Sequence, residues 1–256
     1  MVITSKDNEI VKHIRKLRDK KARDESGEFI VEGIKMIEEA VCENAKIKMV
    51  VVCEDLNQSP IQKNILYKIA KENIIYVSDK IFKLLTDVTT PQGILAVIEK
   101  PKINVIDFSK DLYLILDNIQ DPGNMGTILR TADSVALTQI IVPKGNADSY
   151  NPKVVRSTMG AIFRVNVIEV EDLAKTIKEM KRHKIQILAT DLNTDDTIYD
   201  VSYKKSAIVI GNEGNGVSKE ILDLADKRIK IPMLGKTESL NAAVATGIIL
   251  YHAVQK

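Results

Sequence analysis

The sequence predicts an α/β protein that contains two α/β domains. Short runs of β-branched and other apolar residues alternate with segments of helical periodicity, and they do so in two separate stretches of the chain. Between the two stretches, residues 99–111 interrupt the alternation with a proline and several charges. We therefore expect a small α/β domain over residues 1–100, a linker over 101–111 and a larger α/β domain over 112–256.

The expected elements follow from the periodicity. In the first domain we expect strands at 28–31, 46–53, 74–77 and 94–98, and helices at 34–43, 61–72 and 80–86. In the second domain we expect strands at 112–116, 139–142, 164–169, 185–190, 207–210 and 228–231. The helices expected there are 127–136, 152–161, 172–182, 219–224 and 240–254. Strands that are apolar on both faces, such as 207–210, favour a sheet covered by helices on both sides.

Composition is that of a globular protein, with 45% hydrophobic and 28% charged residues. No apolar run is long enough to span a membrane, and the first residues lack the apolar stretch of a signal peptide, so we expect a cytoplasmic protein. Cys42 and Cys53 stand in apolar surroundings and are interpreted as small core residues. No cluster of Cys, His and carboxylate residues has zinc-ligand spacing, so no metal is expected.

A basic segment lies near the N-terminus. It carries seven positive residues against Asp19 alone, namely Lys12, Arg15, Lys16, Arg18, Lys20, Lys21 and Arg23. Such a segment is either a solvated helix face or a surface that contacts phosphates. The sequence does not decide between these two interpretations.

The last expected helix is apolar on nearly all sides. No charged residue occurs from Ser239 through Gln255. A helix of this kind is expected to be buried in the core or to pack against another subunit. Asn241, Thr246 and His252 make it too polar for a membrane span.

Three loops that follow strands of the second domain carry the candidate site, because ligands of open α/β sheets bind at the carboxyl ends of the strands. The first loop follows strand 112–116. Pro122 and Gly123 predict a turn there, and Gly126 allows a close backbone approach before a helix that Thr127 or Asn124 would cap. Arg130 then falls in the first turns of that helix, where a cation opposes the helix dipole.

The second loop, residues 211–218, has three glycines after an apolar strand. Its spacing approaches that of a phosphate-binding P-loop, but Val217 stands where the P-loop requires lysine, so a nucleotide hydrolase is disfavoured. The loop also departs from the dinucleotide-binding motif, which requires glycine two residues after the first glycine. Glu213 is flanked by Gly211 and Gly214, which favours a functional position for its carboxylate.

The third loop, residues 231–243, leads into the last helix. Ser239 can cap this helix, and Asn241 is expected in its first turn. The free N–H groups of a helix N-terminus can also bind polar ligand groups. The three histidines of the chain lie outside all three loops, which disfavours a histidine-based proton shuttle.

Taken together, the three loops resemble the motifs of the SpoU (TrmH-like) family of RNA ribose methyltransferases. The matching residues, in order, are Asn124 with Gly126 and Arg130; Gly211-Asn-Glu213-Gly with Gly216 and Ser218; and Ile231-Pro-Met with Ser239-Leu-Asn241. Residues 156–161 also look like a helix of the family beside the first loop. Residues 23–33 and 90–93 look like the family's substrate-binding domain, so the resemblance covers essentially the whole chain.

The resemblance implies a catalytic domain tied into a trefoil knot, a homodimer, and S-adenosyl-L-methionine as the cofactor. It implies a first domain that binds RNA, with ribosomal RNA favoured over transfer RNA. By the same resemblance, the cofactor is held around Gly211, Ile231 and Leu240, with Thr190 and Met233 nearby. Methylation of a ribose 2′-hydroxyl is the implied reaction, and this hydroxyl is what distinguishes RNA from DNA.

The resemblance also implies roles for the polar residues. Arg130 activates the 2′-hydroxyl, and Asn124, Glu213, Ser239 and Asn241 orient the substrate and cofactor. Because a guanidinium stays protonated, Arg130 could act as a base or could grip a phosphate and stabilise a developing alkoxide; the sequence leaves both open. The alternative function is a catalytically inactive RNA-binding or ribosome-assembly factor on the same fold.

Overall fold

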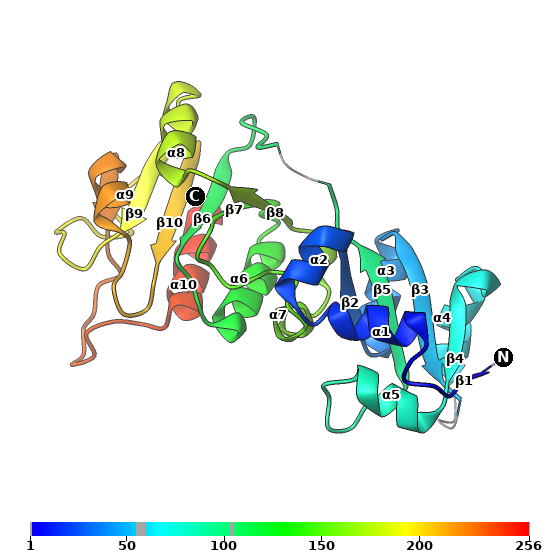
Figure 1. Cartoon of the computed structure of the whole chain (residues 1–256). Helices are drawn as coiled ribbons and strands as arrows, with labels where there is room; N and C mark the ends of the chain where they lie inside the picture. The colour runs from blue at the N-terminus through cyan, green and yellow to red at the C-terminus, as the bar shows by residue number, and fades with distance from the viewer. Residues whose placement is uncertain (1, 55–59, 103–104, 256) are drawn as a thin grey trace. The chain divides into compact units, whose positions relative to one another are not determined.

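The computed structural model describes residues 2–54, 60–102 and 105–255. The contacts divide the chain into two compact units, Met1–Lys102 with Tyr150–Phe163 (unit 1), and Ile103–Ser149 with Arg164–Lys256 (unit 2) (Figure 1). Residues 103 and 104 of the expected linker lie outside the described residues.

Residues 150–163 differ from the expectation, because the sequence places them in the second domain whereas their contacts lie within unit 1. Helix α7 (Pro152–Ser157) packs on strand β2 (Glu28–Glu32). The ring of Phe29 on β2 lies 4.9 Å from the ring of Tyr150 and 6.4 Å from that of Phe163, measured between centroids. Packing of these aromatic rings against one another explains why the segment joins unit 1.

Unit 1 contains a mixed sheet of strands in the order β1-β4-β3-β5-β2. The other strands are β1 (Val2–Ile3), β3 (Ile47–Cys53), β4 (Ile74–Val77) and β5 (Ile94–Glu99). Strand β4 pairs in parallel with β1 and β3, and β5 pairs antiparallel with β2 and β3. The four strands expected from the sequence are confirmed, whereas β1 is too short to be recognised by alternation.

The helices of unit 1 are α1 (Glu9–Lys16), α2 (Lys20–Ser26), α3 (Ile34–Cys42), α4 (Pro60–Tyr67) and α5 (Asp79–Leu85), with a 3-10 turn at Lys71–Asn73. Helices α1 and α5 share a core with the sheet, built from Val11, Ile14, Ile81 and Phe82. Cys53 belongs to this core, but Cys42 is exposed, so its interpretation as a core residue is wrong.

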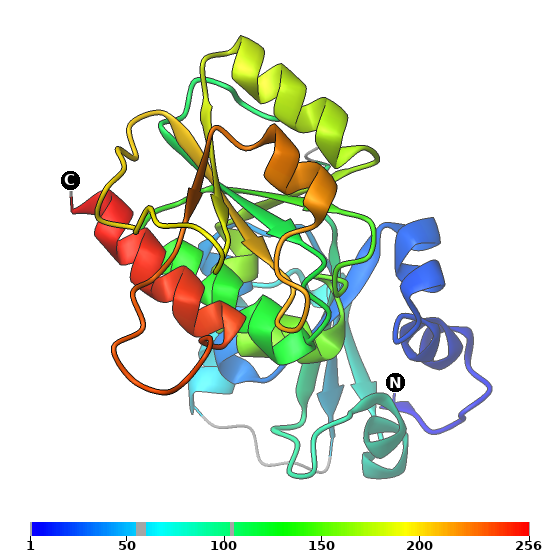
Figure 2. The ribbon, with the colours of Figure 1, turned by 90° about the vertical axis from the view of Figure 1, so that its left-hand side faces the viewer.

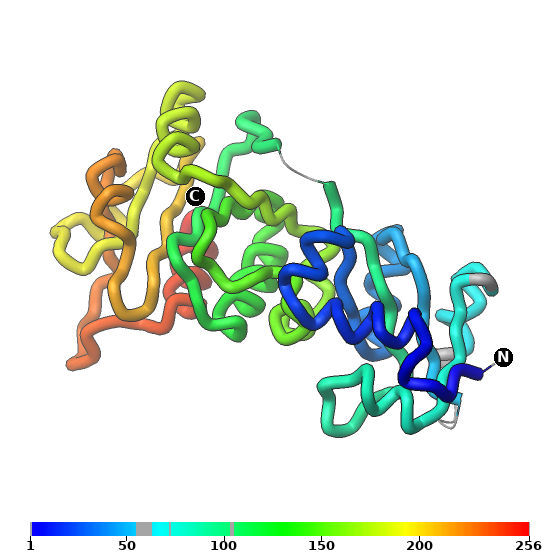
Figure 3. The backbone as a smooth tube through the Cα atoms, in the orientation of Figure 1, coloured from blue at the N-terminus to red at the C-terminus, as the bar shows by residue number. Residues whose placement is uncertain are grey.

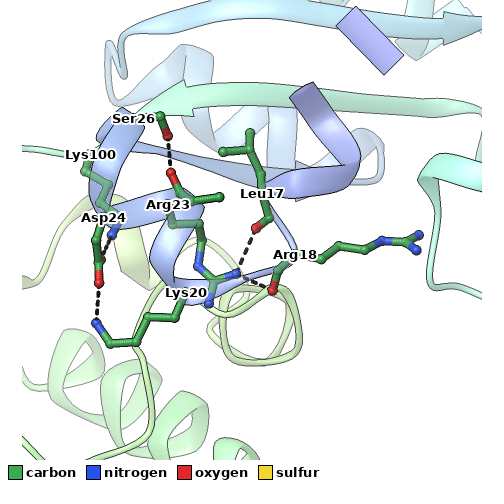
Figure 4. Close-up of polar contacts among 8 residues, drawn as sticks. Leu17, Arg18, Lys20, Arg23, Asp24, Ser26 and Lys100 are labelled. Atoms are coloured by element: carbon green, nitrogen blue, oxygen red, sulfur yellow. Dashed lines mark hydrogen bonds and ion pairs between the residues drawn. The ribbon is translucent and has the colours of Figure 1, made fainter. Parts of the chain in front are cut away.

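The basic segment folds into α1 and α2, and most of its charges are engaged inside unit 1. Arg23 is 1% exposed, and its Nη1 donates to the carbonyls of Leu17 at 2.8 Å and Arg18 at 2.6 Å (Figure 4). Asp24 joins Lys20 and Lys100, each at 2.8 Å. Burial acts to raise the pKa of Asp24, but the hydrogen bonds from Lys100 and Lys20 bring it below its usual value.

The remaining cations of the segment are divided between paired and unpaired. The pairs are Lys12 with Glu9, Arg18 with Asp87, and Lys21 with Glu25. In the described part of the chain, Arg15 and Lys16 form no ion pair. The positive charge excess that the sequence suggests is therefore largely neutralised. The acidic partners are not counted in the segment, because they lie one turn away along a helix or elsewhere in unit 1.

Unit 2 is built on a parallel sheet in the order β11-β9-β10-β6-β7-β8. Its strands are β6 (Leu112–Asp117), β7 (Gln139–Pro143), β8 (Asn166–Val170), β9 (Gln186–Thr190), β10 (Ser206–Gly211) and β11 (Lys227–Ile229). These strands confirm the six expected from the sequence within a few residues, and the chain path between them can be followed in Figure 3.

Helices cover both faces of this sheet (Figure 2). On one face, α8 (Leu173–Arg182) and α9 (Lys219–Leu224) pack on alternate residues such as Tyr113, Ile115, Ala207 and Val209. On the other, α6 (Pro122–Ser134) lies beside α10 (Ala242–Val254), and α10 contacts β10. This arrangement confirms the expectation drawn from strands that are apolar on both faces.

Several helix boundaries differ from the expectation, and three of them have a clear local cause. Helix α6 begins at Pro122 rather than 127, because Asp121 caps it by accepting from the Asn124 N–H at 2.8 Å. Helix α10 begins at Ala242, and its cap is Asn241 rather than Ser239. Helix α7 ends at Ser157 and is followed by a 3-10 turn, Ala161–Phe163, because Met159 and Gly160 have positive φ. No helix in the described ranges is long and apolar enough to cross a membrane.

Candidate active site

The carboxyl ends of four neighbouring strands of unit 2 meet at one edge of the sheet. Gly211 at the end of β10 pairs with Asp117 at the end of β6, and Thr190 at the end of β9 pairs with Ile229 of β11. The segments that leave these strands contain the residues that the sequence predicts for the site. Parallel register therefore brings together loops that are about a hundred residues apart in sequence.

A cavity of about 520 Å³ opens at this edge. The five residues predicted to bind the cofactor all line it, namely Thr190, Gly211, Ile231, Met233 and Leu240. Glu213 and Ser239 also line it, whereas Asn124, Arg130 and Asn241 do not. The volume lies within the range of about 300–1,000 Å³ that is typical of small-molecule sites.

The loop at 211–217 is a closed turn. Asn212 and Gly216 exchange two backbone hydrogen bonds, of 3.0 and 2.9 Å. A Cβ atom on Gly211 would lie 2.1 Å from the backbone atoms of Gly216 and Val217. Glycine is therefore required at 211 by the turn itself, and not only by the approach of a ligand.

Asn212 organises this turn and was missed as a site residue by sequence reasoning. Its Oδ1 accepts from the N–H groups of Gly214 at 2.9 Å and Asn215 at 3.1 Å, and its Nδ2 donates to the Asn118 carbonyl at 3.0 Å. The side chain thereby joins the loop after β10 to the loop after β6. The available signal was an asparagine directly after a strand-end glycine, which is typical of a side-chain-stabilised turn.

The loop after β6 is fixed from two sides. The Asp117 carboxylate accepts from the Ser218 N–H at 2.8 Å. Asn146, in the loop after β7, accepts from the Ile119 N–H at 2.6 Å and donates to the carbonyls of Leu116 and Pro143, both at 2.9 Å. These bonds satisfy backbone groups that no strand partner reaches.

A chain of side-chain hydrogen bonds connects the three motif segments. Asn241 Nδ2 donates to Asn124 Oδ1 at 2.9 Å, and Asn124 Nδ2 donates to Glu213 Oε1. Asn241 Oδ1 accepts from the N–H groups of Ala243 at 2.9 Å and Val244 at 3.3 Å. The structure thus brings Asn124, Glu213 and Asn241 into direct contact, although only Glu213 borders the cavity.

Arg130 lies on the exposed side of α6, nine residues into the helix. Because α6 begins at Pro122, Arg130 is not in the first turns, and the argument from the helix dipole does not apply. Among the described residues, its guanidinium forms no ion pair. Arg130 is therefore free to bind a charged group from outside the chain.

The cavity combines apolar walls with exposed polar edges, which suits a cofactor that has both a flat heterocycle and charged groups. Apolar side chains of Ile231, Met233, Leu240 and Ile249 line one part of it. Residues 211–216, which include Glu213, and the acidic residues Asp191 and Glu238 line another. A carboxylate can receive an ammonium or a hydroxyl group. The residues present thus fit S-adenosylmethionine.

The chain matches two family models. The SpoU rRNA Methylase family matches residues 111–251, and the MRM3-like substrate binding domain matches residues 8–96. The chain is 32% identical over 252 residues to the 23S rRNA (guanosine(2553)-2′-O)-methyltransferase RlmP of Bacillus subtilis, and the match covers 98% of each. It is 30% identical to the mitochondrial rRNA methyltransferase 3A of Danio rerio, over 96% of this chain and 68% of that protein.

Solved structures agree with this grouping. The AdoMet-bound rRNA methyltransferase from Sinorhizobium meliloti has a TM-score of 0.88 and 31% identity, over 100% of this chain and 97% of that one. The SpoU methyltransferase AviRb from Streptomyces viridochromogenes, in complex with AdoMet, has a TM-score of 0.88 and 28% identity, over 97% of each chain. Since one family model covers more than half of the chain and relatives match almost all of it, the chain belongs to the SpoU rRNA methylase family.

Proposed function

We propose that this protein transfers the methyl group of S-adenosylmethionine to a ribose 2′-hydroxyl of 23S ribosomal RNA, at a guanosine. The enzyme class and the cofactor follow from the family and from cofactor-bound structures with which the chain aligns nearly end to end. The choice of RNA and nucleotide is supported by RlmP of Bacillus subtilis, a relative that matches 98% of this chain. The observation that carries the assignment is the contact between Asn124, Glu213 and Asn241 beside the cavity.

In this proposal the cavity holds the cofactor and the polar residues beside it bind the target ribose. The bound cofactor supplies an activated methyl group. The protein must therefore align the ribose oxygen, remove the proton of the hydroxyl and keep other positions of the RNA away from the methyl group. The exposed, unpaired guanidinium of Arg130 suits a phosphate next to the target ribose, because its planar fork matches phosphate oxygens. Ser239, on the cavity wall, suits contact with a polar edge of the cofactor.

We further propose that the protein is a homodimer through α10. One side of this helix packs on α6 and β10, but Val244, Ile248 and Tyr251 on another side are 51%, 37% and 49% exposed. Their spacing of four and three residues makes one apolar stripe. Exposed stripes of this kind are typical of association surfaces. Family membership also supports a trefoil knot in unit 2 and a cytoplasmic location, where ribosomal RNA is found.

The experiment that tests the function has two parts. Mapping of 2′-O-methyl groups on ribosomal RNA should find one guanosine of 23S rRNA unmethylated in a strain that lacks the gene. The purified protein with S-adenosylmethionine should restore methylation of that nucleotide in the extracted RNA. A normal methylation map together with no methyl transfer in vitro would favour the alternative, an inactive RNA-binding factor.

A further inference from the structure

The outer side of helix α4 in unit 1 (cyan in Figure 1) presents an exposed aromatic ring. On the inner side, Ile65 and Leu66 are 3% and 9% exposed, and the helix packs on α3. Tyr67 at the end of the helix is 87% exposed, more than any other aromatic residue in the described part of the chain. A single exposed ring is common on protein surfaces, so its significance depends on its neighbours.

Three lysines lie within four residues of this ring. Lys63 stands one helical turn before Tyr67, Lys68 follows it directly, and Lys71 begins the 3-10 turn that comes next. All three lysines are exposed. The stretch from Pro60 through Lys71 contains no acidic residue, so its formal charge is +3. We call Lys63, Tyr67, Lys68 and Lys71 the α4 patch.

The lysines of the α4 patch differ from many other lysines of unit 1, which have carboxylate partners. Lys46 and Lys48 share Glu99, at 2.7 and 3.3 Å, and Lys83 pairs with Asp79 at 2.6 Å. In the α4 patch, none of the three ammonium groups forms an ion pair or a hydrogen bond with a described residue. Their charge is therefore open to a ligand and is concentrated at one place on the surface.

The basic segment of α1 and α2 lacks this property, although it contains more positive residues. Five of its seven cations are engaged by carboxylates or backbone carbonyls of unit 1. It also contains no Phe, Tyr or Trp. Lysines without partners beside an exposed ring are instead the combination that is typical of surfaces that bind single-stranded nucleic acid.

Each part of the α4 patch suits a different part of an RNA strand. Ammonium groups bind phosphate oxygens, whatever the base sequence. An exposed ring stacks on an unpaired base, because every base has a flat face and the bases of a duplex are already stacked on one another. A surface that carries both groups therefore fits an unpaired nucleotide together with the phosphates beside it.

The α4 patch lies within residues 8–96, which match the MRM3-like substrate binding domain. We propose that it binds an unpaired nucleotide of the RNA substrate at a distance from the methylation site, with Tyr67 stacked on the base and the three lysines on the neighbouring phosphates. This inference rests on the proposed function, which supplies the RNA. The residues that line the cofactor cavity all belong to unit 2, so the patch holds the RNA and takes no part in methyl transfer.

The first test measures the affinity of the whole chain for a 23S ribosomal RNA transcript made in vitro, in the presence of S-adenosylhomocysteine. Tyr67→Ala should weaken binding about 10-fold, a typical loss when a ring that stacks on a base is removed. Tyr67→Phe keeps the ring and should bind like the unmodified protein. Because the side chain is exposed, both variants should keep the thermal midpoint and the affinity for S-adenosylmethionine of the unmodified protein.

The second test measures the contribution of the lysines through the salt dependence of the same binding. The three lysines of the α4 patch are changed together to glutamine. The slope of log affinity against log salt should fall by about 2, since each phosphate contact with a single strand contributes about 0.7. The matched control replaces three exposed lysines that have carboxylate partners, Lys21, Lys46 and Lys83. It removes the same total charge, but its slope should fall by less than about 0.5.

The third test separates stacking from charge with two short RNAs, a single strand and a duplex of the same sequence. The unmodified protein and Tyr67→Phe should prefer the single strand about 10-fold, because only its bases can stack on the ring. Tyr67→Ala should lose this preference. The variant that lacks the three lysines should bind both RNAs more weakly, because both carry phosphates.

The proposal is overturned if Tyr67→Ala binds the transcript within about twofold of the unmodified protein, or if the control variant loses as much salt dependence as the patch variant. Poorer methylation of ribosomal particles by Tyr67→Ala, with full affinity for the protein-free transcript, would also overturn it and would assign the patch to a ribosomal protein. Failure of the proposed function is distinct, because it would appear as absence of methyl transfer by the unmodified protein.

Discussion

Asparagine side chains organise the site more than charged side chains do. Asn124, Asn212 and Asn241 each use both the oxygen and the nitrogen of the amide, in bonds to different segments. An amide carries a donor and an acceptor in one plane, so it can join two segments and give the contact a direction. The charged residues Arg130 and Glu213 are thereby left with free atoms for substrate.

At Arg130, we expect the loss of the guanidinium to affect methyl transfer and not the fold. Because the side chain is exposed and forms no ion pair in the described structure, Arg130→Ala should keep its thermal midpoint and its affinity for S-adenosylmethionine. Single-turnover methylation should fall about 10²–10³-fold, as for other removed charges at reacting centres. Lysine should rescue poorly, because a point charge lacks the planar fork. A near-normal rate would mean that Arg130 is only a surface residue.

At Gly211, we expect a substitution to destabilise the turn in the protein without bound ligand. In Gly211→Val, the new Cβ would overlap the backbone of Gly216 and Val217, so urea unfolding without cofactor should show a loss of at least about 3 kcal/mol. Gly214→Ala is the matched control in the same loop. There the nearest atom to a new Cβ lies at 3.5 Å, so the change should stay within about 0.5 kcal/mol. Equal stability of the two variants would contradict this account.

At the scale of elements, the site is assembled from strand ends and helix starts. Parallel pairing of β6, β9 and β10 aligns the strand ends, and the caps Asp121 and Asn241 set where α6 and α10 begin. The early start of α6 places Asn124 on a helix instead of in a loop. A residue on a helix is held more rigidly than one in a loop, so it can aim a neighbouring carboxylate.

For the turn after β10, we expect Asn212→Ala to weaken cofactor binding. The variant loses the bonds to Gly214, Asn215 and Asn118, and the freed backbone of the cavity wall must then be ordered by the ligand. Isothermal titration calorimetry with S-adenosylmethionine should show about a 10-fold weaker affinity. Thermal unfolding of the variant should have a midpoint a few degrees lower than that of the unmodified protein. Asn64→Ala, exposed on α4, is the control. Unchanged affinity in Asn212→Ala would show that the ligand does not depend on a preformed turn.

For α10, we expect Ile248→Asp to dissociate the proposed dimer. A two-fold interface through this helix would place each substituted residue against the partner copy, where an unpaired carboxylate is costly to bury. Sedimentation velocity should show a monomer. Tyr67→Asp, at an 87% exposed position on α4, should leave the oligomeric state unchanged. If both variants sediment like the unmodified protein, α10 is not the interface.

At the scale of the whole molecule, the chain leaves unit 2 after Ser149 and returns to it at Arg164. Unit 1 therefore does not consist of the N-terminal residues alone, because residues 150–163 belong to it by their contacts. Removal of residues 1–102 would leave the rings of Tyr150 and Phe163 without Phe29 and would leave α7 without β2.

We therefore expect a fragment lacking residues 1–102 to keep the cofactor cavity but to lose stability and RNA methylation. S-adenosylmethionine should still raise its thermal midpoint, by mass action on the folded state. Its midpoint without cofactor should lie below that of the whole chain, because newly exposed apolar surface is no longer buried. Binding of the whole chain to RNA should weaken steeply with salt as counterions are released. Equal methylation by the fragment would show that unit 1 does not bind the substrate.

The sequence by itself determined the two α/β alternations and the strands of unit 2, because strand and helix periodicity are local. The cavity-lining residues Thr190, Gly211, Ile231, Met233 and Leu240 were implied by the resemblance of the three loops to the family's motifs, and the structure brings them together at the common edge of the parallel strands. The bonds that join Asn118, Asn124 and Asn212 to distant segments were decided only by the tertiary structure. So was the membership of residues 150–163 in unit 1, because it depends on partners far away in the chain that no local pattern specifies.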